Sequence, residues 1–337
     1  MILKWFSAII GAGLLVSVSV AGSNGQEAAG VANEKRNVQG ATRRGGFTGP
    51  QVPSLTPLFG DYVHVGVTTA AGRTDIRNLL TILDNMNARD YMHLVWGEEN
   101  YPAAWEDFQL MCPEFQKAAR CRLWLYLTPP SEPPPPEPFG YDYVRWAVEC
   151  AKLAKEYPIV AGLCIDDFNG NVKKFTPRYC KEMMEAAHKI APHLALLVVC
   201  YFGYYEKTIA PHVETGAIDG VIFPYFYPHR NHSDTTRLLP QIETYRRWLD
   251  QRTHNGGLTG YMPLVVMVYA TKHSGSPDQP TPAYVADCLD IGLEATKKGL
   301  ADGVVTYCLP KDKPAFVEAV GTIYKQWKPP RIEGQLE

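Results

Sequence analysis

The chain has 337 residues, of which 46% are hydrophobic and 20% charged, and its formal net charge is −2. This is enough apolar material for one large domain with a substantial core. A near-neutral charge gives no reason to expect nucleic acid or an anionic membrane as a partner. No glycine-rich nucleotide-binding loop is evident, so no cofactor is expected.

The amino terminus has the pattern of an export signal. Lys4 supplies a positive charge, Ile9 to Val20 form a short apolar run, and small residues around Ala21 offer a cleavage site. We predict a signal peptide over 1–23, a flexible leader over 24–55, a folded domain over 56–329 and a tail over 330–337. The mature protein is expected to be secreted or periplasmic. An uncleaved anchor is the alternative, although the run is short for a span of about 20 residues.

The eight cysteines all follow the predicted leader. Cys164, Cys200 and Cys308 lie in apolar runs, where cysteine usually behaves as a small buried hydrophobe. Cys112 and Cys121 are close enough in sequence for a local bridge. No Cys/His spacing typical of a zinc site is present.

From Asp61 onward, strand-like runs alternate with amphipathic segments. Eight such units in about 270 residues predict one (β/α)8 TIM barrel, which typically has about 250 residues. A doubly wound sheet ranks second, because it rarely needs eight units. The predicted strands are Tyr62 to Val67, Tyr91 to Trp96, Arg122 to Leu127, Val160 to Ile165, Leu194 to Tyr201, Gly220 to Tyr225, Leu264 to Tyr269 and Gly303 to Cys308. The predicted helices include Arg73 to Asn87, Tyr141 to Glu156, Arg178 to Ile190, Thr236 to Asp250, Tyr284 to Lys298 and Ala315 to Trp327.

The fourth predicted strand ends in two adjacent carboxylates, Asp166 and Asp167. Sites form at the carboxyl ends of strands in barrels and open α/β sheets, so this pair is a candidate for chemistry. A turn or a cap for the next helix is the structural alternative. If Asp166 points into the barrel, Gly162 and Cys164 share its side, and Asp167 lies just past the strand, where the loop can turn it toward the mouth.

The loops at the same end of the barrel carry aromatic, charged and amide side chains, whereas those at the other end are short. Aromatic rings stack on sugar faces and polar groups bind hydroxyls, so we expect a carbohydrate substrate. The predicted substrate-binding residues are Trp96, Asn169, Tyr201, Tyr225, Tyr227, His229, Tyr269 and Lys272. His232 and His273 could also bind hydroxyls or anionic groups. Glu132, in a proline-rich loop, is expected to shape that loop rather than to react.

Cleavage of a glycosidic bond needs carboxyl groups as acid and as base or nucleophile. Crowding of Asp166 and Asp167 should raise one pKa and give an acid that stays protonated near neutral pH. In a second scheme, Asp166 is the nucleophile or base and a carboxyl group after the second strand, Glu98 or Glu99, is the acid.

The run Ile165-Asp166-Asp167-Phe168 at the end of a fourth barrel strand resembles the dyad of the substrate-assisted hexosaminidases that remove O-linked N-acetylglucosamine. The resemblance implies that Asp166 orients the acetamido group of the substrate and that Asp167 is the general acid/base. More broadly, the chain is similar to secreted barrels of the glycoside hydrolase type. The prediction is therefore a secreted hydrolase of glycosidic bonds.

Two other classes remain open. A non-catalytic glycan-binding barrel would keep the aromatic loops without needing an acid. A metal-dependent hydrolase could use His64 or His93 with Asp166, although the His-x-His pattern of metal barrels is missing after the first strand.

Overall fold

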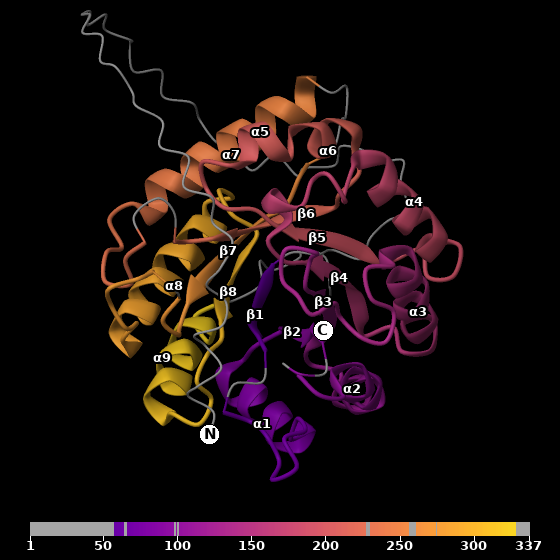
Figure 1. The fold of residues 1–337 in the computed structure, drawn as a ribbon. Coiled ribbons are helices and arrows are strands. Elements are labelled where there is room, and N and C mark those ends of the chain that lie inside the picture. The colour runs from indigo at the N-terminus through magenta and orange to yellow at the C-terminus, as the bar shows by residue number, and fades with distance from the viewer. Residues whose placement is uncertain are drawn as a thin grey trace, which may run out of the picture.

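The computed structural model describes residues 57–63, 66–97, 99, 101–226, 230–255, 261–273 and 275–327. Its eight parallel strands follow one another in chain order and close into a barrel (Figure 1). The predicted single-domain (β/α)8 barrel is therefore confirmed. The strands are β1 (Leu58–Tyr62), β2 (Asp90–Val95), β3 (Arg122–Leu127), β4 (Val160–Ile165), β5 (Ala195–Val199), β6 (Gly220–Pro224), β7 (Leu264–Tyr269) and β8 (Gly303–Tyr307).

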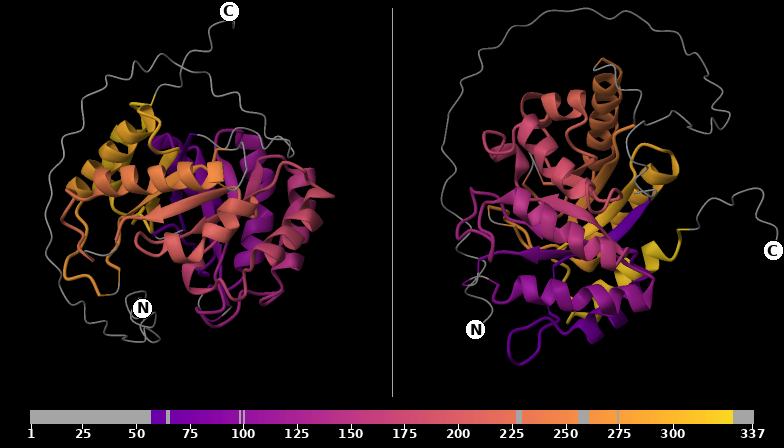
Figure 2. Two further views of the ribbon diagram at one scale, coloured as in Figure 1. Left: turned by 90° about the horizontal axis from the view of Figure 1, so that it is seen from above. Right: turned by 90° about the vertical axis from the view of Figure 1, so that its right-hand side faces the viewer.

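Helices cover the outside of the barrel, as the two further views in Figure 2 also show. α4 and α8 each begin with a Thr-Pro pair. Thr176 and Thr281 accept a hydrogen bond from a backbone N–H in the first turn, and the proline needs no partner there. The helices are α1 (Ile76–Met86), α2 (Ala104–Ala118), α3 (Tyr143–Glu156), η2 (Phe168–Gly170), α4 (Pro177–His188), α5 (Tyr205–Thr208), α6 (Ala210–Thr215), α7 (Leu238–Asn255), α8 (Pro282–Lys297) and α9 (Pro314–Tyr324).

The first predicted strand was placed wrongly. β1 is Leu58–Tyr62 rather than Tyr62 to Val67, and it contains Gly60 and Asp61, which are rare in strands. A Cβ atom on Gly60 would lie 2.1 Å from the Asp90 carbonyl oxygen, so β1 and β2 approach too closely for a side chain there. Asp61 is fully buried and forms an ion pair with Lys311. Tertiary contacts thus override the local preference.

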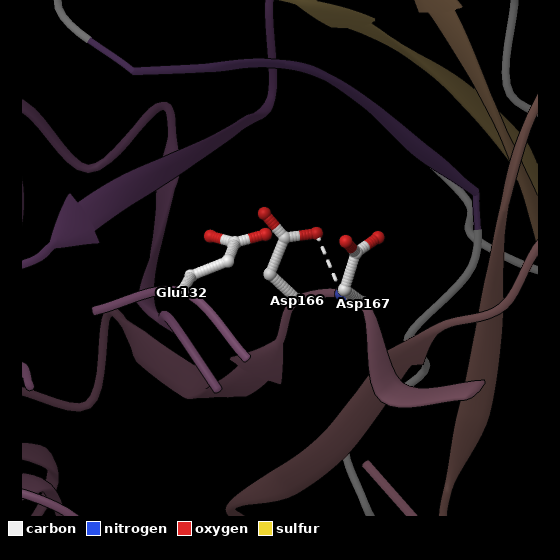
Figure 3. A group of neighbouring side chains, drawn as sticks. All are labelled: Glu132, Asp166 and Asp167. Atoms are coloured by element: carbon white, nitrogen blue, oxygen red, sulfur yellow. Dashed lines mark hydrogen bonds between the residues drawn. The ribbon is translucent and has the colours of Figure 1, made fainter. Parts of the chain in front are cut away.

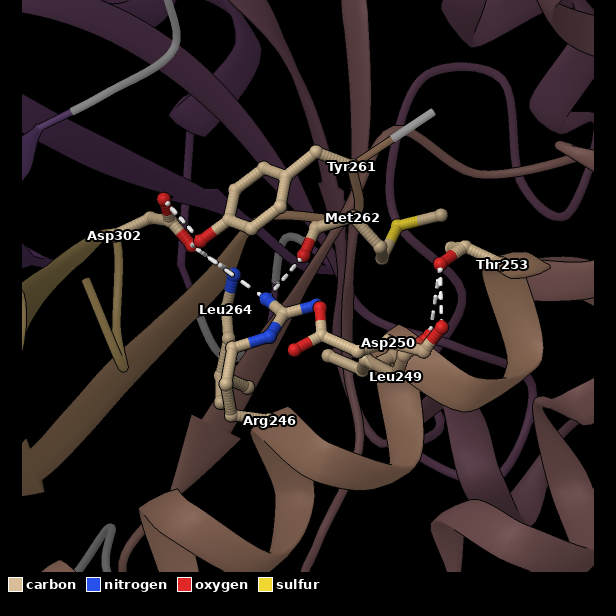
Figure 4. Close-up of polar contacts among 8 residues, drawn as sticks. All are labelled: Arg246, Leu249, Asp250, Thr253, Tyr261, Met262, Leu264 and Asp302. Atoms are coloured by element: carbon tan, nitrogen blue, oxygen red, sulfur yellow. Dashed lines mark hydrogen bonds and ion pairs between the residues drawn. The ribbon is translucent and has the colours of Figure 1, made fainter. Parts of the chain in front are cut away.

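A buried polar network lies at the amino-terminal ends of β7 and β8 (Figure 4). The Asp302 carboxylate accepts hydrogen bonds from the Tyr261 hydroxyl at 2.6 and 2.8 Å and from the Leu264 N–H at 2.9 Å. Arg246 of α7 lies 3.9 Å from Asp302 and 2.7 Å from Asp250. Most polar groups of this network bind one another, and the network lies at the end of the barrel opposite the predicted site, so it serves stability rather than ligand binding.

All eight cysteines are buried and free, so the possible bridge between Cys112 and Cys121 is not formed. The predicted signal peptide, leader and tail lie outside the described residues. Within the part of the chain that is described, no helix combines the length and the apolar character that a membrane crossing requires.

Candidate active site

Asp166 and Asp167 follow β4 at the carboxyl-terminal end of the barrel. In a continuing strand their side chains would point to opposite faces. Asp167 instead has φ 36° and ψ 39°, in the left-handed region that aspartate tolerates better than most residues. The chain turns there, and the Asp167 N–H donates a 2.8 Å hydrogen bond to Asp166 Oδ1. This turn brings both carboxyl groups to the same place (Figure 3).

Glu132 joins the two aspartates from the loop that follows β3. One carboxylate oxygen from each of Glu132, Asp166 and Asp167 lies within 4.8 Å of the others (Figure 3). Glu132 was expected to shape its loop rather than to react, and the structure places its carboxyl group beside the dyad, where it can also take part in chemistry. We call these three residues the carboxyl cluster.

Burial raises the pKa of every member of the carboxyl cluster, and the charges of neighbouring carboxylates add to the rise at Asp166 and Glu132. Burial first, and then the charge of Asp167, raise the pKa of Asp166 to about 7, while the nearby Tyr126 hydroxyl and the Asp167 N–H oppose the rise. Burial and the charges of Asp166 and Asp167 raise the pKa of Glu132 well above its ordinary value. The hydrogen bond between Glu132 and Asp167 raises the pKa of Glu132 further and lowers that of Asp167. The hydrogen bond between Glu132 and Asp167 thus favours the protonated form of Glu132 and the ionised form of Asp167.

Five tyrosines surround the carboxyl cluster inside the barrel. The rings of Tyr62 and Tyr126 lie 4.3 Å apart, those of Tyr62 and Tyr307 4.9 Å, and those of Tyr269 and Tyr307 4.6 Å. The Tyr201 and Tyr269 hydroxyls are 3.0 Å apart, and a hydrogen bond with Tyr201 lowers the pKa of Asp167. The buried Tyr126 hydroxyl has no hydrogen-bond partner of good geometry among the described residues.

His273, after β7, is the basic side chain whose charge acts on Asp167 and lowers its pKa. Its ring packs against Phe226, with centroids 4.5 Å apart, and edge-on against Tyr269 at 5.1 Å. Its backbone N–H donates to His232 Nε2 at 3.1 Å. From its sequence position, His273 was predicted as a possible hydroxyl or anion ligand, but it was not among the predicted site residues.

Four of the predicted substrate-binding residues lie at or beside the carboxyl cluster. Tyr201 and Tyr269 contact it as described above. Trp96 is half-buried and donates its indole N–H to the Glu132 carbonyl oxygen at 3.1 Å. Asn169 Oδ1 accepts a hydrogen bond from the Tyr201 N–H at 3.3 Å. Trp96 and Asn169 thus support the loops of the site.

Three other residues that were predicted for the site do not contact the carboxyl cluster in the structure. Tyr225 is buried, and its hydroxyl donates to the Asp234 carbonyl oxygen at 2.8 Å. Lys272 is exposed and reaches the Pro277 carbonyl oxygen at 3.4 Å, and Glu99 is exposed. Glu98, Tyr227 and His229, which the sequence also predicted for the site, lie outside the described residues.

Of the two histidines suggested as metal ligands, the structure describes His93, and its ring is engaged with α2. His93 is fully buried, with Nε2 2.9 Å from the Ala104 carbonyl oxygen of α2, and burial lowers its pKa to about 4. His64 lies outside the described residues. The carboxyl cluster itself offers hard oxygen atoms that suit Mg²⁺ or Ca²⁺, so a chelator control belongs in any activity assay.

No family model matches the chain, and no curated protein matches it in sequence. Solved structures match its fold. A chitinase domain from Pyrococcus furiosus, with catalytic-site mutations, aligns over 82% of this chain and 98% of its own at 10% identity, with a TM-score of 0.54. An α-L-arabinofuranosidase from Thermotoga maritima aligns over 81% and 70%, also at 10% identity and a TM-score of 0.54. A GH2 β-galacturonidase from Eisenbergiella tayi aligns over 81% and 51% at 12% identity, with a TM-score of 0.51, so the chain spans about half of that enzyme.

The chain has the fold of glycoside hydrolase barrels. Because these identities are low, the likeness concerns the fold alone.

Proposed function

We propose that this protein hydrolyses glycosidic bonds at the carboxyl-terminal mouth of its barrel. The observation that carries the proposal is the carboxyl cluster, in which Glu132 from one loop faces Asp166 and Asp167 from the next. Such a cluster holds a proton at neutral pH beside a carboxylate, which is the pairing that this reaction needs. The shared fold with chitinases and other glycoside hydrolases supports the same chemistry.

In the proposed mechanism, Glu132 protonates the leaving-group oxygen as the bond to the anomeric carbon breaks. Asp167, which accepts the hydrogen bond from Glu132, supplies the carboxylate that attacks that carbon. Water then hydrolyses the glycosyl intermediate, with Glu132 accepting its proton. Retaining enzymes keep their two carboxyl groups about 5 to 5.5 Å apart and inverting enzymes about 6.5 to 9.5 Å apart. One oxygen from each member of the carboxyl cluster lies within 4.8 Å of the others, which is closer than the separation in inverting enzymes.

The tyrosines around the carboxyl cluster would form the sugar-binding surface. The half-buried rings of Tyr201 and Tyr307 offer apolar faces for stacking, and the buried Tyr126 hydroxyl lies beside Asp166. The hexosaminidase resemblance makes a different assignment, in which Asp166 orients an acetamido group and Asp167 is the acid. An N-acetylhexosaminide substrate would favour that assignment, and a substrate without the acetamido group would exclude it.

The proposal is tested by comparing the mature protein with its Asp167→Asn variant on a broad panel of aryl glycosides and polysaccharides. Asparagine also tolerates the left-handed backbone, so the variant keeps the local fold. Asp290→Asn, at an exposed position of α8, is the matched control. The proposal would be supported if the wild type and Asp290→Asn turn over a substrate, Asp167→Asn does not, and a chelator leaves the wild-type rate unchanged.

Two outcomes would contradict the proposal. Turnover that a chelator abolishes would point to a metal-dependent hydrolase. Glycan binding by all three proteins without turnover on any substrate would point to a binding module.

A further inference from the structure

One side-chain amide, that of Asn171, joins the two loops that carry the carboxyl cluster. Its Oδ1 accepts a 3.1 Å hydrogen bond from the N–H of Ser131, the residue before Glu132. Its Nδ2 donates to Ser131 Oγ at 2.8 Å and to the Asp167 carbonyl oxygen at 2.9 Å. The side chain is 7% exposed. Asn171 therefore links the backbone beside Glu132 directly to the backbone of Asp167.

The backbone of Asn171 is held without help from this amide. Its N–H donates to the Phe168 carbonyl oxygen at 2.9 Å, and its own carbonyl oxygen accepts from Lys174 at 2.9 Å and Phe175 at 3.0 Å. The turn after β4 thus forms through main-chain hydrogen bonds. Of the three side-chain hydrogen bonds, the two to Ser131 fix one loop against the other, and the third, to the Asp167 carbonyl oxygen, lies within the loop after β4.

Glu132 is held on its other side as well. The Trp96 indole N–H donates to the Glu132 carbonyl oxygen, and the loop after β2 packs on the proline-rich loop so closely that a Cβ atom on Gly97 would lie 2.4 Å from Pro134 Cγ. Trp96 ties Glu132 to the loop after β2, while Asn171 ties Ser131 to Asp167. Among these contacts, those of Asn171 alone run between the Glu132 loop and the Asp167 loop.

We propose that Asn171 is a positioning residue whose side-chain amide sets the separation of the Glu132 and Asp167 loops and so holds the proton-donating carboxyl group against its acceptor. This inference rests on the proposed function. Asn171 contributes no atom to the reaction. Without its amide, Glu132 can move toward solvent on its loop, and a misplacement of about 1 Å in an active site typically costs about 100-fold in rate.

The test is the Asn171→Ala variant, measured on a substrate that the wild type turns over. We expect kcat to fall by about 10- to 100-fold with KM changed less than about twofold, because binding surfaces elsewhere are intact. Ser131→Ala removes one of the three hydrogen bonds and should give a smaller loss. Asn85→Ala, at an exposed position of α1, is the matched control and should leave kcat unchanged.

A double-mutant cycle separates positioning from general loss of structure. If Asn171 acts through Glu132, the substitution Asn171→Ala should cost little once Glu132→Gln is present. An equal loss of kcat in both backgrounds would overturn the inference, and so would an unchanged kcat in Asn171→Ala.

A crystal structure of Asn171→Ala gives a readout that does not depend on turnover. We expect the Glu132 carboxyl group to lie farther from Asp167 than in a crystal structure of the wild type. An unmoved Glu132 would refute the positioning role. A wild type without turnover would refute the proposed function alone, since the two crystal structures still decide the role of Asn171.

Discussion

Replacing Asp166 with asparagine should stabilise the folded protein at pH 8. Asp166 is 9% exposed, and its pKa rises from 3.8 to about 7 in the folded state because of burial and the charge of Asp167. Ionising it inside the barrel therefore works against folding. Asparagine has the same shape, cannot ionise, and keeps an oxygen that can accept the hydrogen bond from the Asp167 N–H.

The size of this effect follows from the change in proton affinity. Each tenfold change corresponds to about 1.4 kcal/mol, so a pKa that rises from 3.8 to about 7 corresponds to at most about 4 kcal/mol. Because the pKa is raised on folding, this contribution to stability is fully present below about pH 4. It is lost as the pH rises through about 7. Because asparagine cannot ionise, the free energy of unfolding of Asp166→Asn does not fall in this way as the pH rises.

The assay is urea unfolding of the wild type and Asp166→Asn at pH 5 and pH 8, with Asp290→Asn as a control. We expect the variant to gain up to about 3 kcal/mol relative to the wild type between the two pH values, because the part of the effect below pH 5 lies outside this range. Coupling with the other two carboxyl groups spreads the gain over a wider range of pH. A variant that is less stable than the wild type at pH 8, or a difference that does not change with pH, would refute this reasoning.

Three further substitutions have distinct expected results. Asp302→Ala removes the buried carboxylate that accepts hydrogen bonds from the Tyr261 hydroxyl and the Leu264 N–H, and it should lower the free energy of unfolding by about 1 to 3 kcal/mol without changing KM, as measured by denaturant unfolding and kinetics on the folded protein. Trp96→Phe removes the hydrogen bond to the Glu132 carbonyl, worth about 1 kcal/mol, and should lower kcat several-fold in steady-state kinetics. Tyr201→Phe removes a hydrogen bond that lowers the pKa of Asp167, so the acidic limb of the profile of kcat/KM against pH should move to higher pH; an unmoved limb would contradict this.

The barrel could be predicted because its signal is repeated many times along the chain. β3, β4 and β7 match their predicted ranges, since each is a continuous apolar run that is buried in the wall of the barrel. β1 could not be placed in the same way. The close contact that requires Gly60 and the partner that neutralises Asp61 come from residues far away in the sequence.

Two of the three members of the carboxyl cluster could be predicted from the sequence. Asp166 and Asp167 stand at the end of a clear strand, where chemistry is expected in a barrel. The position of the Glu132 carboxyl group could not be predicted, because a proline-rich sequence indicates the shape of a loop but not the direction of its side chains. The sequence position of Glu132 did carry a signal: it is the first carboxylate after the strand that neighbours β4, and loops after adjacent parallel strands meet at one end of the sheet. The role of Asn171 depends on a contact between loops, which only the structure gives.

The most direct test of the proposed chemistry is the leaving-group dependence of the Glu132→Gln variant, measured as kcat/KM on a series of aryl glycosides of the active sugar. A general acid matters most when the leaving group is poor, and its loss typically costs about 10²- to 10⁴-fold. We predict a loss of this size for poorly acidic leaving groups and near wild-type rates for the most acidic ones. An equal loss across the series, or no loss at all, would contradict the assignment of Glu132 as the proton donor.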